Sequence, residues 1–135
     1  MSGAGSTDLT GVWLGLYSYP RELEPVSFTA TLIDTSGAIS GSSHEAFPRA
    51  PLGPCTALAA LCGRRDEHVV AFVKTYDGGI PHNRPIRYDG AIVDEGNEIE
   101  GRWIIPRVWS GKFLMVRSAP NAGTIVRRKY ERVRI

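Results

Sequence analysis

Between breaks rich in glycine and proline, the chain runs in short segments in which apolar and polar residues alternate with a period of two. Such alternation is typical of β-strands with one buried face, because successive side chains in a strand point to opposite faces. Fifteen glycines and nine prolines leave little room for long helices. We expect strands at 11–18, 25–34, 38–45, 68–76, 86–94, 98–105 and 110–118.

Two further segments are ambiguous. Residues 56–62 (TALAALC) have the composition of a short helix, with a capping residue at each end, but they stand between strands. We favour a strand here, followed by a turn at 63–67. Residues 124–135 fit either a ninth strand or a terminal helix, because their apolar positions also have helical spacing.

About eight strands joined by short turns predict an all-β fold, a single antiparallel up-and-down barrel. Parallel strands need longer crossover connections than this chain offers, and closure removes the exposed edges of an open sheet. A sandwich of two sheets is the alternative. With 135 residues the chain forms one domain, residues 1–135. Within it we expect a flexible N-terminus (1–8) and a basic C-terminal tail or extra strand (119–135).

The alternation also assigns side chains to the inside of the barrel. The expected apolar wall consists of Trp13, Tyr17, Phe28, Phe72, Tyr88, Trp103, Phe113 and Met115. On 110–118 both faces contain apolar residues, so periodicity alone does not decide which face is inside. Four polar side chains share these inner faces: Glu45, Lys74, Tyr76 and Arg117.

Charges inside a barrel need partners, because desolvation costs several kcal/mol per ion. In one interpretation, Glu45 pairs with Lys74 or Arg117, and an arginine stacks on Trp13 at the closed end. In the other, Lys74, Arg117 and the tyrosine hydroxyls hold the acidic head of a ligand, whose apolar body lies on the aromatic wall. An eight-stranded barrel encloses enough room for packed side chains or one small ligand.

The segment Leu9-Thr-Gly-Val-Trp13 resembles the opening of lipocalins and avidins. The stretches 70–78, 86–92, 99–106 and 110–117 resemble a group of small bacterial proteins of calycin-like fold without known function. This resemblance implies a calycin-like barrel with a ligand in its interior. Gly15 stands where biotin binders carry a polar ligand contact, so we do not expect biotin. Haem barrels with a similar opening need an axial histidine, and none of the three histidines has a matching context.

Charge and motifs exclude several classes. The net charge of +2 is too small to indicate a nucleic-acid partner, although the last nine residues contain five basic side chains and one acidic one. No apolar run approaches a membrane span, and the start MSGAGSTD lacks the features of a signal peptide. We therefore expect a cytoplasmic protein with Cys55 and Cys62 reduced. No motif indicates a metal or other cofactor, and alternation separates the neighbours in Ser42-Ser43-His44-Glu45, so no catalytic residue is assigned.

Three functions remain open. The first is a small-molecule-binding barrel for an apolar or acidic ligand. The second is a protein–protein interaction or assembly module whose barrel is filled by its own side chains, with Trp109 and the basic tail as contact surfaces. The third is a cofactor-free isomerase or hydrolase built around Glu45. The sequence leaves open whether the chain forms homo-oligomers.

Overall fold

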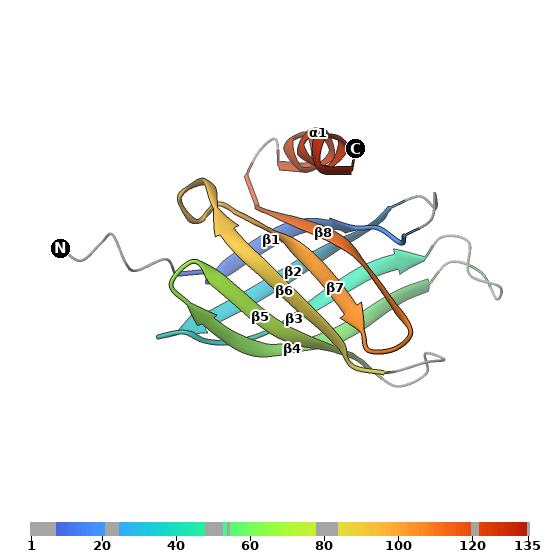
Figure 1. Cartoon of the computed structure of the whole chain (residues 1–135), viewed down its shortest axis with the longest axis horizontal. Coiled ribbons are helices and arrows are strands. Elements are labelled where there is room, and N and C mark those ends of the chain that lie inside the picture. Colours follow the sequence, from blue (N-terminus) through green and yellow to red (C-terminus); the bar gives the residue numbers. More distant parts are fainter. Residues whose placement is uncertain are drawn as a thin grey trace.

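The computed structural model describes residues 8–20, 25–47, 53, 55–77, 84–119 and 122–134. Its strands are β1 (Gly11–Tyr17), β2 (Val26–Thr35), β3 (Ala38–Phe47), β4 (Cys55–Asp66), β5 (Val69–Tyr76), β6 (Ile86–Val93), β7 (Glu98–Ile105) and β8 (Trp109–Arg117). Each strand pairs antiparallel with the next, and β8 pairs with β1 (Figure 1). The predicted up-and-down barrel is confirmed, and the sandwich is excluded. The predicted flexible N-terminus lies outside the described residues, apart from Asp8.

The segment with helical composition is a strand, as favoured, but the turn predicted at 63–67 is wrong. Strand β4 continues to Asp66, and the chain reverses at Glu67 and His68. Gly63 lies within the strand, at a point where the backbones of β4 and β5 approach too closely for a side chain. An added Cβ would lie 2.0 Å from the carbonyl oxygen of Ala71. Pairing with β3 on one side and β5 on the other outweighs the helical propensity of the segment.

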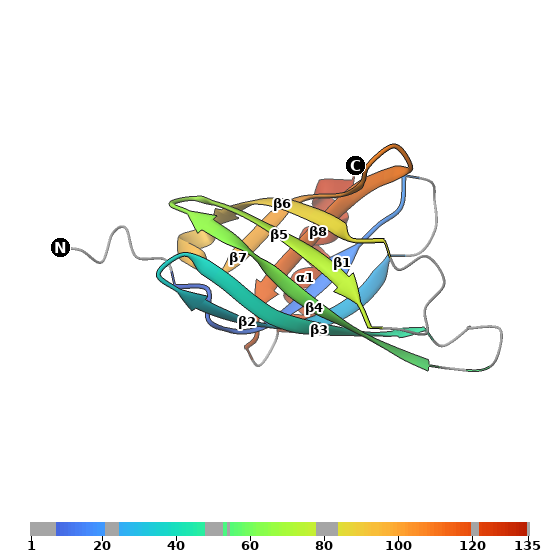
Figure 2. The same ribbon diagram turned by 90° about the horizontal axis from the view of Figure 1, so that it is seen from below.

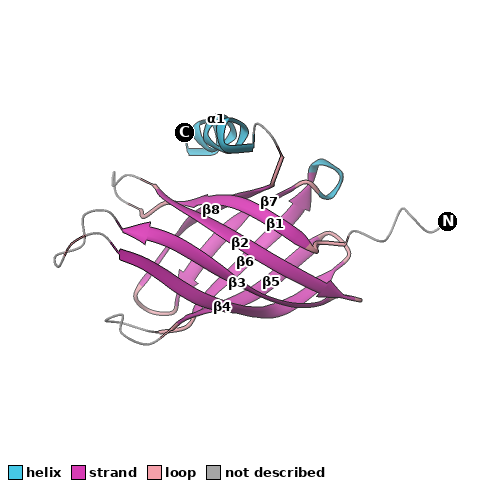
Figure 3. Cartoon of the chain, turned by 180° about the vertical axis from the view of Figure 1, so that it is seen from behind, coloured by secondary structure: helices cyan, strands magenta, loops and turns pink. Residues whose placement is uncertain are grey.

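The C-terminal segment is a helix, α1 (Ala122–Arg134), and not an extra strand. It lies along the outside of β1 and β8 (Figures 1 and 3). Its contact with the barrel is a second apolar cluster, made of Leu16, Leu114, Val116, Val126 and Tyr130. Because α1 covers the outer face of β8, the outward side chains of that strand are buried and apolar, as are the inward ones. No helix in the described part of the chain is both long and apolar enough to cross a membrane.

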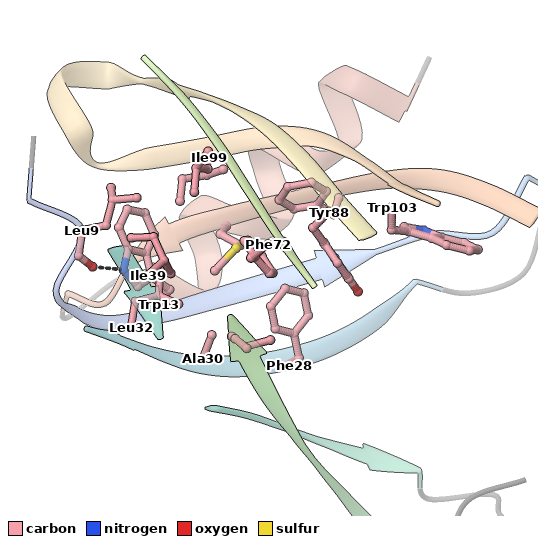
Figure 4. Packing of buried hydrophobic residues seen from close by; sticks show 14 of the residues in the cluster. Leu9, Trp13, Phe28, Ala30, Leu32, Ile39, Phe72, Tyr88, Ile99 and Trp103 are labelled. Atoms are coloured by element: carbon pink, nitrogen blue, oxygen red, sulfur yellow. Dashed lines mark hydrogen bonds between the residues drawn. The ribbon is translucent and has the colours of Figure 1, made fainter. Parts of the chain in front are cut away.

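The barrel interior contains all eight side chains of the predicted apolar wall, each no more than 6% exposed. Figure 4 labels five of them: Trp13, Phe28, Phe72, Tyr88 and Trp103. Phe72 and Tyr88 stack with ring centroids 5.0 Å apart, and Phe113 meets Tyr88 edge to face at 4.9 Å. Such aromatic pairs add to the stabilisation that comes from burial alone. These ring contacts join β5, β6 and β8 in the core.

One end of the barrel is closed by Trp13 and Arg117. The indole Nε1 of Trp13 donates to the carbonyl oxygen of Leu9 at 2.9 Å (Figure 4). The guanidinium carbon of Arg117 lies 4.6 Å from the centroid of the Trp13 ring. The guanidinium also donates to three backbone carbonyl oxygens, those of Asp8, Thr10 and Gly96. Arg117 thus ties the segment before β1 to the turn before β7.

Candidate functional site

A buried polar cluster lies toward the other end of the barrel, where β1 ends. Its centre is Glu45 on β3, which reaches across to Tyr17 on β1 and to Lys74 and Tyr76 on β5. The Glu45 Oε1 accepts from the Lys74 Nζ at 2.5 Å and from the Tyr76 hydroxyl at 2.9 Å. Its Oε2 accepts from the Tyr17 hydroxyl at 2.5 Å. These four residues, here called the Glu45 cluster, give both carboxylate oxygens a donor.

The ion pair at the centre of the cluster is almost completely removed from solvent. The side chains of Lys74 and Glu45 are 2% and 0% exposed. The Lys74 ammonium is also surrounded by aromatic rings, with centroids 4.8–5.7 Å away, belonging to Tyr17, Phe28, Tyr76 and Tyr88. Ring faces attract cations, and more strongly where water is excluded. The positive charge is therefore held by one carboxylate and a wall of aromatic rings.

Burial shifts the protonation equilibria of this cluster. It lowers the pKa of Lys74, because desolvation disfavours the ammonium, and the nearby Glu45 only partly offsets this effect. Burial, reinforced by the charge of Glu45, raises the pKa of Tyr17 and of Tyr76 above the ordinary value of 10.0. Both hydroxyls therefore keep their protons at neutral pH and act as donors to the carboxylate.

Ser43 is a polar interior residue that the sequence analysis did not select. It lies two residues before Glu45 on the same face of β3, opposite Ala30 on β2 and Ala59 on β4. It is 3% exposed, and its Oγ has no hydrogen-bond partner among the described residues. A buried hydroxyl without a partner is costly. Because Ser43 and Glu45 are two residues apart in one strand, the alternation that places Glu45 inside the barrel also places Ser43 there.

Aromatic side chains continue from the cluster to the end of the barrel. Tyr17 meets Trp103 edge to face at 6.2 Å, and Tyr19 lies between Trp103 (5.6 Å) and Trp109 (4.8 Å). The Trp103 Nε1 donates to the carbonyl oxygen of Ser18 at 2.8 Å, which fixes the indole against the end of β1. Trp109 is 38% exposed, so this aromatic group extends from the buried cluster to the surface.

The structure divides the predicted site residues into three groups. Around the polar cluster it brings together Tyr17, Phe28, Glu45, Lys74, Tyr76, Tyr88 and Trp103. Three others, Phe72, Phe113 and Met115, belong to the packed middle of the core. The remaining two, Trp13 and Arg117, lie together at the closed end and bind each other and backbone carbonyls instead of Glu45.

The neighbours Ser42-Ser43-His44-Glu45 do not share one face of β3. Along β3, Ser43 and Glu45 are buried, whereas Ser42 and His44 are exposed, so the four neighbours do not assemble into one site. Within the residues that the structure describes, no group of three or more His, Cys, Asp or Glu side chains could hold a metal ion. On α1, the basic side chain of Lys129 is already engaged: its Nζ donates to Glu98 and lies 3.6 Å from the Oδ2 of Asp94.

No protein-family model matches this chain, and no curated protein matches it. The fold and the site define its class instead. It is a closed, eight-stranded antiparallel barrel with an ion pair and two tyrosine hydroxyls buried in its interior.

Proposed function

We propose that this protein binds a small, mostly apolar molecule inside the barrel, at the end that contains the Glu45 cluster. The observation that carries the proposal is an ion pair buried among aromatic rings, on the same face of β3 as a Ser43 hydroxyl without a partner in the described chain. A buried ion pair is often no more stabilising than a well-packed apolar pair of similar volume. Fold stability alone therefore gives little reason for these groups, whereas ligand recognition gives one.

The charge balance of the cluster favours an uncharged ligand over an acidic one. Lys74 and Glu45 neutralise each other, so an acidic head group would have to displace Glu45 from Lys74 and leave two carboxylates close together. A hydroxyl, carbonyl or amide group could bond to Ser43 without breaking the pair. The rings of Phe28, Tyr88 and Trp103 supply apolar surface for the rest of the molecule.

The resemblance of the sequence to calycin-like barrels supports the same function. Small closed barrels of eight strands are suited to hold one small ligand. Tryptophan and glycine in the opening segment 9–13 occupy the start of β1, at the closed end of this barrel. We further propose a reducing, cytoplasmic location, because Cys55 and Cys62 are both free and exposed.

Native mass spectrometry of the freshly purified protein, beside a denatured control, tests the proposal directly. We expect a mass excess that disappears on denaturation and that corresponds to an uncharged, largely apolar compound. Binding can also be measured with N-phenylnaphthylamine, an uncharged fluorescent probe. A bare mass together with no binding of this probe would contradict the proposal.

Two serine variants connect binding to the site. Ser43→Ala removes the inward hydroxyl, and the adjacent Ser42→Ala removes an outward one from the same strand. We expect Ser43→Ala to weaken binding of the natural ligand about fivefold, which is the effect of losing one hydrogen bond of about 1 kcal/mol. Ser42→Ala is the matched control and should leave binding unchanged. Equal effects of the two substitutions would exclude Ser43 from the site.

A further inference from the structure

Lys74 lies inside the barrel, and its surroundings differ from those of the other two lysines of the chain. The side chain of Lys74 is 2% exposed. Lys112 stands exposed on the outer face of β8, and Lys129 lies on α1, where its ammonium donates to Glu98. A lysine that is desolvated in an apolar pocket is the kind that attacks carbonyl compounds. Among the three lysines, Lys74 therefore has the surroundings of a nucleophile.

The Lys74 ammonium lies close to one end of the barrel. Strands β1, β3 and β5 run in the same direction and end together, on the right in Figure 2. Lys74 and Glu45 each lie two residues before the end of their strand, and Tyr76, the last residue of β5, is only partly buried. The amine is therefore near the rim of this end, within the proposed ligand-binding region.

We propose that Lys74 binds an uncharged, apolar aldehyde covalently, as a protonated imine whose counterion is Glu45. This inference rests on the proposed function and names the class of ligand and the atom that holds it. A protonated imine carries the same single positive charge as the ammonium that it replaces. The Glu45 Oε1 lies 2.5 Å from the Lys74 Nζ, and the rings of Tyr17, Phe28 and Tyr88 lie around that nitrogen. The groups that hold the ammonium can therefore hold the imine, without leaving a buried charge unpaired.

The reaction is a condensation that leaves the charge of the cluster unchanged. Lys74 passes a proton to Glu45, and the neutral amine forms a carbon–nitrogen bond with the carbonyl carbon, while the carbonyl oxygen takes a proton from the nitrogen. The hydroxyl of this carbinolamine then takes the proton back from Glu45 and leaves as water, and the nitrogen lone pair closes the C=N bond. Ammonium and aldehyde thus give protonated imine and water, and nothing is oxidised or reduced.

Burial favours the neutral amine that this reaction needs. It lowers the pKa of Lys74 below the ordinary value of 10.5. The hydrogen bond to Glu98 instead raises the pKa of Lys129. At neutral pH a larger fraction of Lys74 than of Lys129 is therefore available to attack a carbonyl group.

Reductive labelling with 2-naphthaldehyde and sodium cyanoborohydride tests the proposal on the wild-type chain. The aldehyde is uncharged and apolar, and the reductant converts an imine into a stable secondary amine. Mass spectrometry after chymotrypsin digestion locates the naphthylmethyl group. We expect Lys74 to be labelled at least tenfold faster than Lys112 or Lys129. In urea this preference should disappear, because all three amines are then exposed to solvent.

The alcohol 2-naphthalenemethanol separates this inference from the proposed function. It has the same rings but cannot form an imine, so it should displace N-phenylnaphthylamine without labelling any residue. Displacement by the alcohol, together with equal labelling of the three lysines by the aldehyde, would overturn covalent binding and leave the proposed function intact. No displacement, together with no preference for Lys74, would contradict both.

Variants connect the labelling to the ion pair. Because Lys74→Met alone leaves Glu45 buried without its cation, the double variant Glu45→Gln/Lys74→Met is the one to label. It should keep probe binding but lose the fast phase of labelling. Lys112→Arg is the matched control on the outer surface and should label at Lys74 at the wild-type rate. A fast phase that survives in the double variant would place the reaction at another amine and overturn the proposal.

Discussion

The two ends of the barrel hold charged side chains in different ways. At the closed end, Arg117 stacks on Trp13 and donates to three backbone carbonyls, so its charge fastens separate chain segments together. At the other end, the partners of Glu45 and Lys74 among the described residues are side chains, those of two tyrosines and the surrounding rings. Backbone partners are fixed by the fold, whereas side-chain partners can be exchanged for a ligand. This difference is the reason for proposing ligand binding at the second end and not at the first.

The largest effect is expected from breaking the ion pair. Lys74→Met leaves the Glu45 carboxylate buried without its cation and should lower the free energy of unfolding by about 3–5 kcal/mol. The double variant Glu45→Gln/Lys74→Met removes both charges and should recover most of that loss. Urea unfolding of the wild type, the two single variants and the double variant measures the coupling. A loss below about 1 kcal/mol in Lys74→Met would show that the pair is not held in a dry interior.

A smaller loss is expected at the closed end. Arg117→Met keeps the apolar contact with Trp13 but removes the hydrogen bonds to the backbone, which should cost about 2 kcal/mol. Ligand and probe binding should not change, because Arg117 lies away from the Glu45 cluster. Arg117→Lys keeps the positive charge but loses the planar guanidinium, which donates in several directions at once. Its stability should lie between those of the wild type and Arg117→Met. Weaker probe binding at unchanged stability would instead place Arg117 in the site.

The period-two pattern and the short turns were sufficient to predict the antiparallel strands, and the barrel was favoured over a sandwich because closure removes exposed strand edges. The pairing of β8 with β1 decides between the two. The pattern was insufficient where both faces are buried. On β8 the residues Leu114 and Val116 are as apolar as Phe113 and Met115, since α1 packs on the outer face. The pattern also did not locate the end of β4, where Gly63 serves close strand packing instead of a turn.

For the site, alternation gives the side of the sheet on which a residue lies but not its height along the barrel axis. Arg117 shares the inner face of β8 with Phe113, but strand register pairs Arg117 with Trp13 at one end and Phe113 with Tyr17 nearer the other. Register depends on long-range pairing, which the sequence alone did not reveal. Ser43 has the same parity as Glu45 on β3, so alternation places it inside as well, but nothing in the sequence indicates that its hydroxyl has no hydrogen-bond partner there.

The charge preference of the binding end sharpens the comparison further. Anilinonaphthalene sulfonate has the ring system of N-phenylnaphthylamine with an added negative charge. We expect the wild type to bind the uncharged probe about tenfold more tightly, a difference of about 1.4 kcal/mol, because Glu45 repels the sulfonate. Glu45→Gln should reduce this preference, whereas Arg117→Met should leave it unchanged. Equal preferences in all three proteins would place the probes outside the Glu45 end.

The smallest effect for each residue is expected from the tyrosines of the binding end at alkaline pH. Burial raises the pKa of Tyr17, Tyr76 and Tyr88 above 10.0, so above that pH the folded state retains protons that the unfolded chain has lost. Stability is therefore fully present below pH 10 and falls as pH rises, by up to about 1.4 kcal/mol per tyrosine for each pH unit. Tyr17→Phe should make the decline shallower. Absorbance at the tyrosinate band should show these residues ionising only as the barrel unfolds, and early ionisation with the fold intact would mean that water reaches the Glu45 cluster.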